Sequence, residues 1–303
     1  MTWLLENTPA SAKRKVFRDQ LNSGKLHSYV GAFSPYIALM VETLEFDGVY
    51  ISGAGISNDL GYPDIGLTTL TEVTQRSAAI AKSVRCPSFV DVDTGFGETM
   101  NMARSIRELE DAGLAGCHLE DQVNPKRCGH LDNKGLVSTE EMCRKVKAAH
   151  DARTDENFVI CARTDSRASE GLEASIERAK SYVDAGADMI FPEALKSPEE
   201  FEAFRKAVSV PLLANMTEFG KSELLSRKQL SSLGYNMVIY PMTCFRLAMG
   251  AIEEGLKKIK TEGDQKNLLD QMQTRSRLYE YLNYSAYNEK DQNIFNFKLR
   301  GDQ

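Results

Sequence analysis

The sequence contains no hydrophobic run close to the length of a membrane-spanning helix and no excess of positive charge. Such a helix needs about 20 apolar residues. The N-terminal segment holds only the short apolar run that begins at Trp3, which is too short for a secretory signal. The net charge is −6, which disfavours nucleic-acid and anionic-membrane partners because these need a basic surface. We therefore expect a cytoplasmic protein with no nucleic-acid or membrane partner.

Cysteine is scarce, and no two cysteines form a C-x-x-C pair. The six cysteines lie at positions 86, 117, 128, 143, 161 and 244. This spacing favours neither a zinc site nor a thioredoxin-like motif. Cys86, Cys117 and Cys161 lie in apolar runs and are interpreted as small core residues. A reducing compartment is the expected setting.

Motifs for nucleotide binding are also missing, but short apolar runs alternate with helical patterns. No G-x-G-x-x-G follows the first predicted strand, which disfavours a dinucleotide-binding sheet. The predicted strands are nearly continuous in apolar residues, as in a parallel sheet buried on both faces. They are Ser28–Phe33, Gly48–Gly53, Pro87–Asp93, Gly116–Asp121, Phe158–Arg163, Asp188–Glu193, Pro211–Asn215 and Asn236–Pro241. The predicted helices include Met100–Asp111, Thr139–Ala152, Leu172–Asp184 and Ser222–Leu233.

Glycine follows several of these helices, as a left-handed stop residue often does. Gly113, Gly186 and Gly48 stand at such positions, directly before the next strand. Eight strand–helix units predict one closed (β/α)₈ TIM-type barrel over residues 28 to about 260. The remainder, about 261–303, is predicted as a C-terminal helical arm of the same single catalytic domain (1–303), because it is too apolar to stay exposed.

Polar side chains stand at the carboxyl ends of nearly all predicted strands, where barrel enzymes carry their catalytic groups. The ends are Ser52-Gly53, Asp91-Val92-Asp93, His118 to Asp121, Arg163-Thr164-Asp165, Pro192-Glu193, Asn215 to Glu218 and Tyr240-Pro241. Asp91 and Asp93 are two residues apart, which on a strand places both on one face. With Glu120 nearby they suit Mg²⁺, although either aspartate could instead cap the following helix.

The cations at these positions allow two interpretations. Arg163 could form an internal salt bridge or clamp a substrate carboxylate. Arg246 and Arg275 lie in the helical tail, and their spacing alone favours surface charges. Cys128 follows two cations and precedes Gly129 and His130 in a polar loop. This setting favours thiolate formation, so the thiol is either reactive or incidental.

Taken together, these stretches resemble the isocitrate lyase / phosphoenolpyruvate mutase superfamily over about residues 13 to 295. The matching motifs are Lys126-Arg127-Cys128-Gly129-His130, His118-Leu119-Glu120-Asp121-Gln122, Ser52-Gly53, Gly61-Tyr62-Pro63-Asp64, Asp91 to Gly97, Ala162-Arg163-Thr164-Asp165, Phe191-Pro192-Glu193-Ala194, Asn215 to Gly220 and Met272-Gln273-Thr274-Arg275. The K-R-C-G-H loop, the length of about 300 residues and the Met272–Arg275 stretch resemble the 2-methylisocitrate lyase branch. Ala54 departs from it, since that branch usually has glycine there.

The resemblance implies a site for each part of the reaction. Asp91 and Asp93 would hold Mg²⁺, or alternatively Mn²⁺, with Asp64 and Glu120 reaching it through waters. Tyr50 would be the base and Cys128 the acid, with Arg163 and His130 also in the catalytic set. The implied substrate-binding residues are Ser52, Gly53, Ala54, Cys128, Gly129, Arg163, Glu193, Asn215, Thr217, Arg246 and Arg275.

The implied activity is Mg²⁺-dependent cleavage of a small tricarboxylate, 2-methylisocitrate, to pyruvate and succinate, as in propionate catabolism through the methylcitrate cycle. The implied assembly is a homotetramer, a dimer of dimers in which subunits exchange a helix. The alternatives are isocitrate lyase activity, another C–C lyase or oxaloacetate decarboxylase of the superfamily, and a non-catalytic metabolite-binding homologue. The presence of Asp91, Asp93 and Cys128 counts against the last of these.

Overall fold

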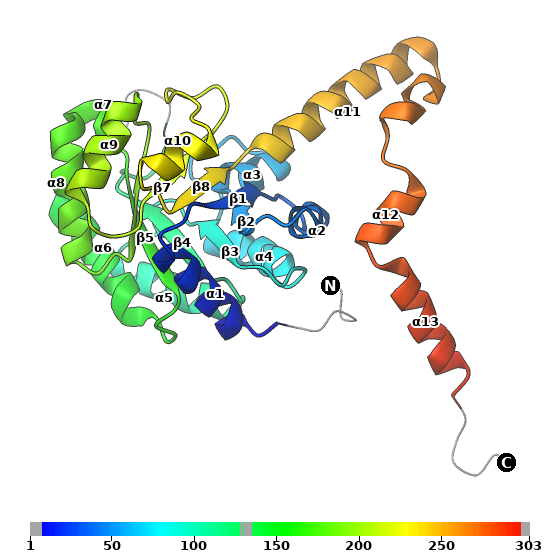
Figure 1. The fold of residues 1–303 in the computed structure, drawn as a ribbon, viewed down its shortest axis with the longest axis horizontal. Helices are drawn as coiled ribbons and strands as arrows, with labels where there is room; N and C mark the ends of the chain where they lie inside the picture. The colour runs from blue at the N-terminus through cyan, green and yellow to red at the C-terminus, as the bar shows by residue number, and fades with distance from the viewer. Residues whose placement is uncertain (1–7, 128, 130–134, 298–303) are drawn as a thin grey trace.

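Eight parallel strands form the centre of the molecule in the computed structural model, which describes residues 8–127, 129 and 135–297 (Figure 1). They are β1 (His27–Gly31), β2 (Gly48–Ile51), β3 (Ser88–Asp91), β4 (Gly116–Glu120), β5 (Val159–Thr164), β6 (Met189–Pro192), β7 (Leu213–Asn215) and β8 (Met237–Tyr240). Their order is β6-β5-β4-β3-β2-β1-β8-β7. A parallel bridge between Ile190 and Leu212 joins the two ends of this order. The sheet thus forms the predicted (β/α)₈ TIM-type barrel.

Helices surround this barrel, and the last ones leave it (Figure 1). They are α1 (Ala10–Asn22), α2 (Pro35–Thr43), α3 (Gly53–Asp59), α4 (Leu70–Ala81), α5 (Thr99–Asp111), α6 (Thr139–Ala152), α7 (Arg167–Glu170), α8 (Leu172–Asp184), α9 (Pro198–Ala207), α10 (Arg227–Ser232), α11 (Thr243–Glu262), the 3₁₀ helix η1 (Lys266–Gln271), α12 (Arg275–Tyr281) and α13 (Tyr284–Phe295). Helix α11 points away from the barrel, and the chain then turns back through α12 and α13. Helix α12 packs against α2.

Apolar side chains fill both sides of the sheet, which explains why the strands are nearly continuous in apolar residues. One buried cluster lies between the strands and the surrounding helices. A second cluster fills the barrel interior and includes Tyr29, Phe89 and Phe191. Phe17 of α1 belongs to the interior cluster, with its ring centroid 5.2 Å from that of Tyr29. Helix α1 therefore closes the end of the barrel opposite the carboxyl ends of the strands.

All eight predicted strands are present, with ends that differ by one or two residues. The prediction for Ser222–Leu233 was wrong in extent, because only Arg227–Ser232 is helical. Gly113 and Gly186 are the expected left-handed stops, with φ of 88° and 109°. Gly48 is not such a stop: Glu45, with φ of 60°, ends α2 instead. Glycine is required at 48 because a Cβ atom there would lie 2.2 Å from Cε1 of Tyr29.

Two further observations concern membrane-spanning helices and the burial of the cysteines. Within the described residues, no helix is both long enough and apolar enough to cross a bilayer. Cys117 and Cys161 are fully buried, as core residues should be, and Cys86 is partly buried. Burial raises the pKa of the Cys86 thiol to about 12, so this thiol is unreactive at neutral pH.

Candidate active site

A polar cavity of about 180 Å³ opens at the carboxyl ends of the barrel strands. Its walls combine carboxylates, cations, amides and backbone from several strand–helix loops. They are formed by Tyr50, Ser52, Ala54, Asn58, Asp64, Asp91, Lys126, Gly129, Arg163, Phe191, Glu193, Asn215, Thr217, Pro241, Met242 and Arg246. Six of the seven polar strand ends named above therefore contribute at least one residue to this cavity, as barrel topology requires.

Asp91 and Asp93 lie close together, but they do not share one face of a strand as their spacing predicted. Strand β3 ends at Asp91, and Asp93 has a left-handed backbone with φ of 48°. Oδ1 of Asp91 accepts a hydrogen bond of 3.0 Å from the Asp93 N–H, and this bond holds the turn. Neither aspartate caps α5, whose N-cap residue is Glu98. The turn, rather than one face of a strand, places the two carboxylates close together, and Asp91 lines the cavity.

Lys126 is the cation closest to these carboxylates. Its Nζ lies 2.8 Å from Oδ1 of Asp93 and also pairs with Oδ1 of Asp64. Burial alone would lower the pKa of Lys126, but the carboxylates of Asp93, Glu120, Asp64 and Asp91 raise it well above its ordinary value. The ammonium is therefore charged at neutral pH. Burial raises the pKa of Asp93 to about 6, although Lys126 opposes this shift.

Arg163 forms an internal network of ion pairs at the cavity wall. Its Nε lies 2.9 Å from Oδ2 of Asp165 and 3.3 Å from Oε2 of Glu120, and its Nη2 lies 3.2 Å from Oε2 of Glu193. The guanidinium also lies over the Phe191 ring, 5.0 Å from its centroid. The structure therefore contains the internal salt bridge that was one of the two interpretations of Arg163. Because Arg163 also lines the cavity, it can still contact a substrate carboxylate.

Tyr50 of β2 is hydrogen-bonded to His118 of β4. Burial lowers the pKa of His118 to about 4, so the ring is neutral at physiological pH. Its Nε2 can accept the hydrogen bond of 2.8 Å from the Tyr50 hydroxyl. Burial, followed by the charge of Asp91, raises the pKa of Tyr50 well above its ordinary value. The phenol is therefore protonated at neutral pH and donates its hydrogen bond to His118.

Backbone and amide groups complete the walls on two sides. The N–H of Gly53, at the start of α3, donates to Oδ2 of Asp91 over 3.2 Å. A Cβ atom on Gly53 would lie 3.0 Å from that oxygen, so glycine allows this close approach. On the other side, Nδ2 of Asn215 donates to the Glu193 carboxylate at 3.3 Å from Oε2, while Oδ1 of Asn215 is buried without a hydrogen-bond partner.

The two arginines of the helical tail have different positions. Arg246 lines the cavity, lies over the ring of Phe219 and is 3.6 Å from Oε2 of Glu218. Arg246 is thus exposed, as its spacing predicts, but it also lines the cavity. Arg275 is exposed at the start of α12 and does not line the cavity of its own subunit.

The loop after Lys126 is described only in part. Gly129 lines the cavity, and a Cβ atom there would lie 2.3 Å from Nη2 of Arg163 and 2.6 Å from Cγ of Glu193. The loop backbone thus approaches the Arg163 network closely. Cys128 and His130, the predicted acid and its neighbour, lie outside the described residues.

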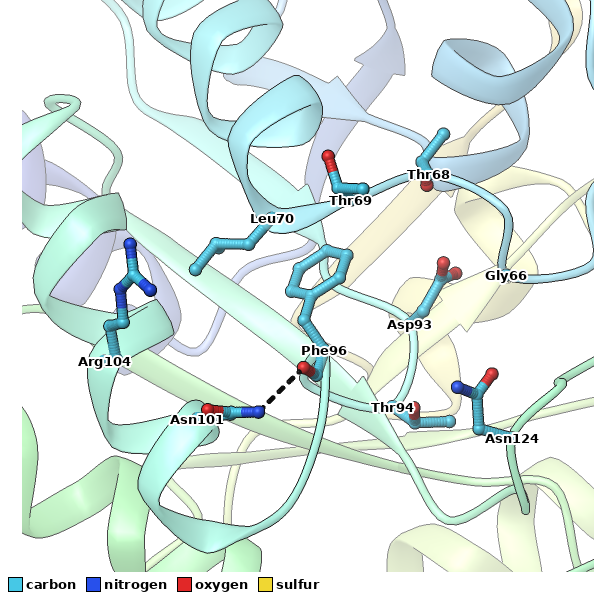
Figure 2. A pocket seen from close by; sticks show the side chains of 10 residues that line it. All are labelled: Gly66, Thr68, Thr69, Leu70, Asp93, Thr94, Phe96, Asn101, Arg104 and Asn124. Carbon is cyan, nitrogen blue, oxygen red and sulfur yellow. Dashed lines mark hydrogen bonds between the residues drawn. The ribbon is translucent and has the colours of Figure 1, made fainter.

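Figure 2 shows a second pocket, of about 300 Å³, which Asp93 helps to line. Asp93, Thr94 and Asn124 lie on one side of it, and Asn101 and Arg104 on the other. Nδ2 of Asn101 donates to the backbone oxygen of Phe96 (dashed line in Figure 2). Asp93 lines this second pocket, whereas Asp91 lines the first cavity.

The residues at this point of the barrel fit a hard divalent cation. Oε1 of Glu120 is buried without a partner, and Oδ1 of the buried Asp93 carboxylate contacts Lys126 Nζ. Among the described residues, no three His, Cys, Asp or Glu side chains converge closely enough to enclose an ion by themselves. Mg²⁺ does not need such a cage, because it keeps several waters and binds one or two carboxylates together with substrate oxygens.

Sequence reasoning missed two contacts that shape this site. Lys126 was recognised only as a cation before a cysteine, and His118 only as a polar strand end. Alternation along β4 could have placed His118 inside the barrel, where it meets Tyr50. No local signal could have placed Lys126 against Asp64, because these residues are 62 positions apart.

Comparison with known proteins identifies the family. A family model described as phosphoenolpyruvate phosphomutase matches residues 17–260, which contain all eight strands and the cavity. The chain belongs to the phosphoenolpyruvate phosphomutase family. Among curated members with high similarity, "Probable 2-methylisocitrate lyase 2" of Corynebacterium glutamicum is 57% identical over 285 residues, covering 94% of this chain and 93% of that protein. The 2-methylisocitrate lyase of Escherichia coli is 44% identical, covering 93% and 96%.

Solved structures of the phosphoenolpyruvate phosphomutase family share the fold. Oxaloacetate acetylhydrolase in complex with 3,3-difluorooxalacetate is 31% identical with a TM-score of 0.90, covering 97% of this chain and 100% of the other. A 2,3-dimethylmalate lyase is 30% identical with a TM-score of 0.88, covering 97% and 98%. Phosphonopyruvate hydrolase in complex with oxalate and Mg²⁺ is 29% identical with a TM-score of 0.84, covering 94% and 99%.

Proposed function

We propose that this protein is a carbon–carbon lyase that cleaves 2-methylisocitrate to pyruvate and succinate. The observation that carries the proposal is the 57% identity, over nearly the full length of both chains, to a relative named as a 2-methylisocitrate lyase. The cavity supports it, because the arginines at 163 and 246 and the amide of Asn215 can bind the carboxylates of such a substrate.

The metal in this proposal is Mg²⁺, with Mn²⁺ as an alternative, held by Asp93 and Asp91. Asp64 and Glu120 would reach it through waters. The buried Asp93 carboxylate and the buried, unpartnered Oε1 of Glu120 support this placement, as does the Mg²⁺ named with a related phosphonopyruvate hydrolase. When bound, the ion would polarise the substrate hydroxyl and lower its pKa.

The chemistry requires one proton to leave and one to arrive. The tertiary hydroxyl of the substrate loses its proton as the adjacent C–C bond breaks, and the hydroxyl carbon becomes the ketone of pyruvate. The bonding electron pair stays on the other carbon, which gains a proton to give succinate. Tyr50 lies at the cavity wall and is the proposed base. Because burial raises the pKa of its phenol, this role requires that the positive charge of the bound cation lower that pKa. Cys128 is the proposed acid, with His130 as its titrating neighbour.

The remaining groups would bind and orient the substrate. Ser52, Gly53 and Ala54 would receive the pyruvate-forming end together with Arg163. The succinate-forming end would contact a second set, formed by Glu193, Asn215, Thr217, Arg246, Arg275 and the backbone of Cys128 and Gly129. Closure of the cavity around the substrate would exclude water and protect the carbanion from unwanted protonation.

The whole chain is proposed to act as one catalytic domain with an arm that forms a homotetramer. No residue of α11 is buried, and its apolar side chains at 252, 256 and 259 follow helical spacing. An apolar groove of about 560 Å³, lined by residues such as Ile37, Met40 and Leu247, lies between α2 and the start of α11. Exchange of α11 between subunits would cover both surfaces.

The test is to identify the ketoacid released from each candidate substrate. Purified protein with Mg²⁺ is incubated with 2-methylisocitrate, isocitrate, 2,3-dimethylmalate or oxaloacetate, and the products are separated by chromatography. Pyruvate and succinate from 2-methylisocitrate are expected as the main products. A pocket discriminates one methyl group by only about 1–3 kcal/mol, so slow release of glyoxylate from isocitrate is compatible with the proposal. Faster turnover of any other substrate would contradict it.

The role of the thiol is tested by Cys128→Ser. We expect turnover to fall by roughly 10²–10⁴-fold, as for loss of a positioned proton donor. Binding of succinate, measured by calorimetry, should persist. Cys143→Ser, which changes a cysteine of α6 away from the cavity, is the matched control. Near-normal turnover of the Cys128 variant would rule out the acid role.

A further inference from the structure

Lys126 occupies the same carboxylate oxygens that a divalent cation would need. Its Nζ contacts Oδ1 of Asp93 at 2.8 Å and pairs with Asp64. The Lys126 side chain is 4% exposed, so this ammonium is not an incidental surface charge. Oδ1 of Asp93 cannot hold Lys126 and a divalent cation together without bringing two positive charges into contact.

We propose that Lys126 is a displaceable counter-ion: its ammonium and the divalent cation compete for Asp93 and Asp64. The inference rests on the metal site of the proposed function but not on the identity of the substrate. Lysine suits such an exchange, because its ammonium is a compact charge on a flexible four-carbon stem.

The polar cavity offers a position for the displaced ammonium of Lys126. Lys126 lines the polar cavity as well as contacting the aspartates. Its backbone can stay fixed, because the neighbouring Arg127 N–H donates to Oε1 of Gln122 at 2.9 Å and the Arg127 carbonyl accepts from Nε2 at 2.8 Å. Rotation of the side chain therefore moves the charge from the aspartates into the cavity. There it can pair with an anionic substrate, so metal binding would prepare the cavity for the tricarboxylate.

The first test measures binding of Mn²⁺ alone by calorimetry, without substrate. Lys126→Gln removes the competing charge, and we expect it to tighten Mn²⁺ binding by on the order of tenfold. Arg127→Gln is the matched control: it removes the same charge from the next, exposed side chain, and we expect a change of about twofold or less. Equal affinities of the wild-type protein and Lys126→Gln, or weaker binding by Lys126→Gln, would overturn the proposal.

The second test uses the wild-type protein, so it does not depend on the folding of a variant. Lysines are acetylated briefly with acetic anhydride, with and without Mn²⁺, and quantified by mass spectrometry. We expect Mn²⁺ to raise the labelling of Lys126 several-fold and to leave Lys147, an exposed lysine of α6, unchanged. Constant labelling of Lys126 at saturating Mn²⁺ would contradict displacement.

The outcomes separate this inference from the proposed function. If Mn²⁺ binds the wild-type protein and not Asp93→Asn, the metal site is confirmed. The Mn²⁺ affinity of Lys126→Gln and the labelling of Lys126 then test whether Lys126 is displaced. If no variant binds Mn²⁺, both the metal site and the inference are wrong. Loss of 2-methylisocitrate cleavage with normal Mn²⁺ binding would contradict only the proposed function.

Discussion

At the scale of single residues, the site depends on close approaches that only particular side chains permit. Gly53 and Gly129 bring backbone against the carboxylates and against Arg163, where a methyl group would collide. Lys126 and His118 satisfy groups that would otherwise be buried without a partner. Buried charges of the site form ion pairs in the described part of the chain, for example Asp93 with Lys126 and Glu193 with Arg163.

Gly129→Ala should reduce turnover without unfolding the barrel. The new Cβ would lie 2.3 Å from Nη2 of Arg163, so either the loop or the arginine must move. A displacement of about 1 Å near reacting groups can cost roughly 10²-fold in rate. Gly135→Ala is the control, because its Cβ would meet only Val123, at 3.5 Å. Steady-state kinetics with circular dichroism measure both variants, and equal rates for the two would refute the steric argument.

At the scale of elements, α1 is held to the barrel by ionic contacts far from the cavity. Nη1 of Arg14 donates to Oδ2 of Asp155 over 3.2 Å, and the Asn157 N–H donates to Oδ1 of the same carboxylate over 3.0 Å. Partial burial alone would raise the pKa of Asp155, but the Asn157 and Arg14 contacts lower it below its ordinary value. The loop before β5 is thereby tied to α1.

Asp155→Asn should lower the free energy of unfolding by about 1 kcal/mol at neutral pH, a value reduced by partial exposure to solvent. The folded pKa lies below the unfolded value of about 3.9. The stabilisation is therefore complete above about pH 4 and is lost as the pH falls through the folded pKa. Urea denaturation of both proteins from pH 7 to pH 3 measures the difference. The control is Asp151→Asn, an exposed carboxylate of α6. A difference that grows on acidification would contradict the assignment.

At the scale of the whole molecule, the arm after the barrel leaves large apolar side chains exposed. Leu247 and Leu256 of α11 are 70% and 61% exposed. Helix α12 returns to its own α2, where the ring centroids of Tyr36 and Tyr281 are 6.0 Å apart. This contact leaves Arg275 outside its own cavity. If Arg275 binds substrate, the neighbouring subunit must supply it.

Mixed oligomers test this arrangement. Arg275→Ala and Asp93→Asn subunits are each expected to be inactive alone. Because a mixed pair would contain one site with both residues intact, random mixing should restore about a quarter of wild-type activity. No recovery in mixed oligomers, confirmed by mass spectrometry of the intact assembly, would indicate that Arg275 acts within its own subunit or not at all.

A second measurement at this scale addresses the arm itself. Leu256→Glu places a charge on the apolar face of α11 and should dissociate the tetramer, because burying an unpaired charge is costly. Light scattering after size exclusion gives the mass. Lys258→Glu, on the same helix, is the control for a change of charge alone. A tetramer that survives Leu256→Glu would contradict exchange of α11.

The sequence by itself determined the eight strands, the barrel and the strand ends that carry polar groups. Period, apolar runs and glycine stops are local signals, and the barrel topology then brings the strand ends together. Only the tertiary structure decided which side chains contact one another in the site. The Lys126 pairing with Asp64, the buried Tyr50–His118 contact and the distance of Arg275 from its own cavity all depend on residues remote in sequence. Such contacts depend on distances in space, which no local pattern of residues encodes.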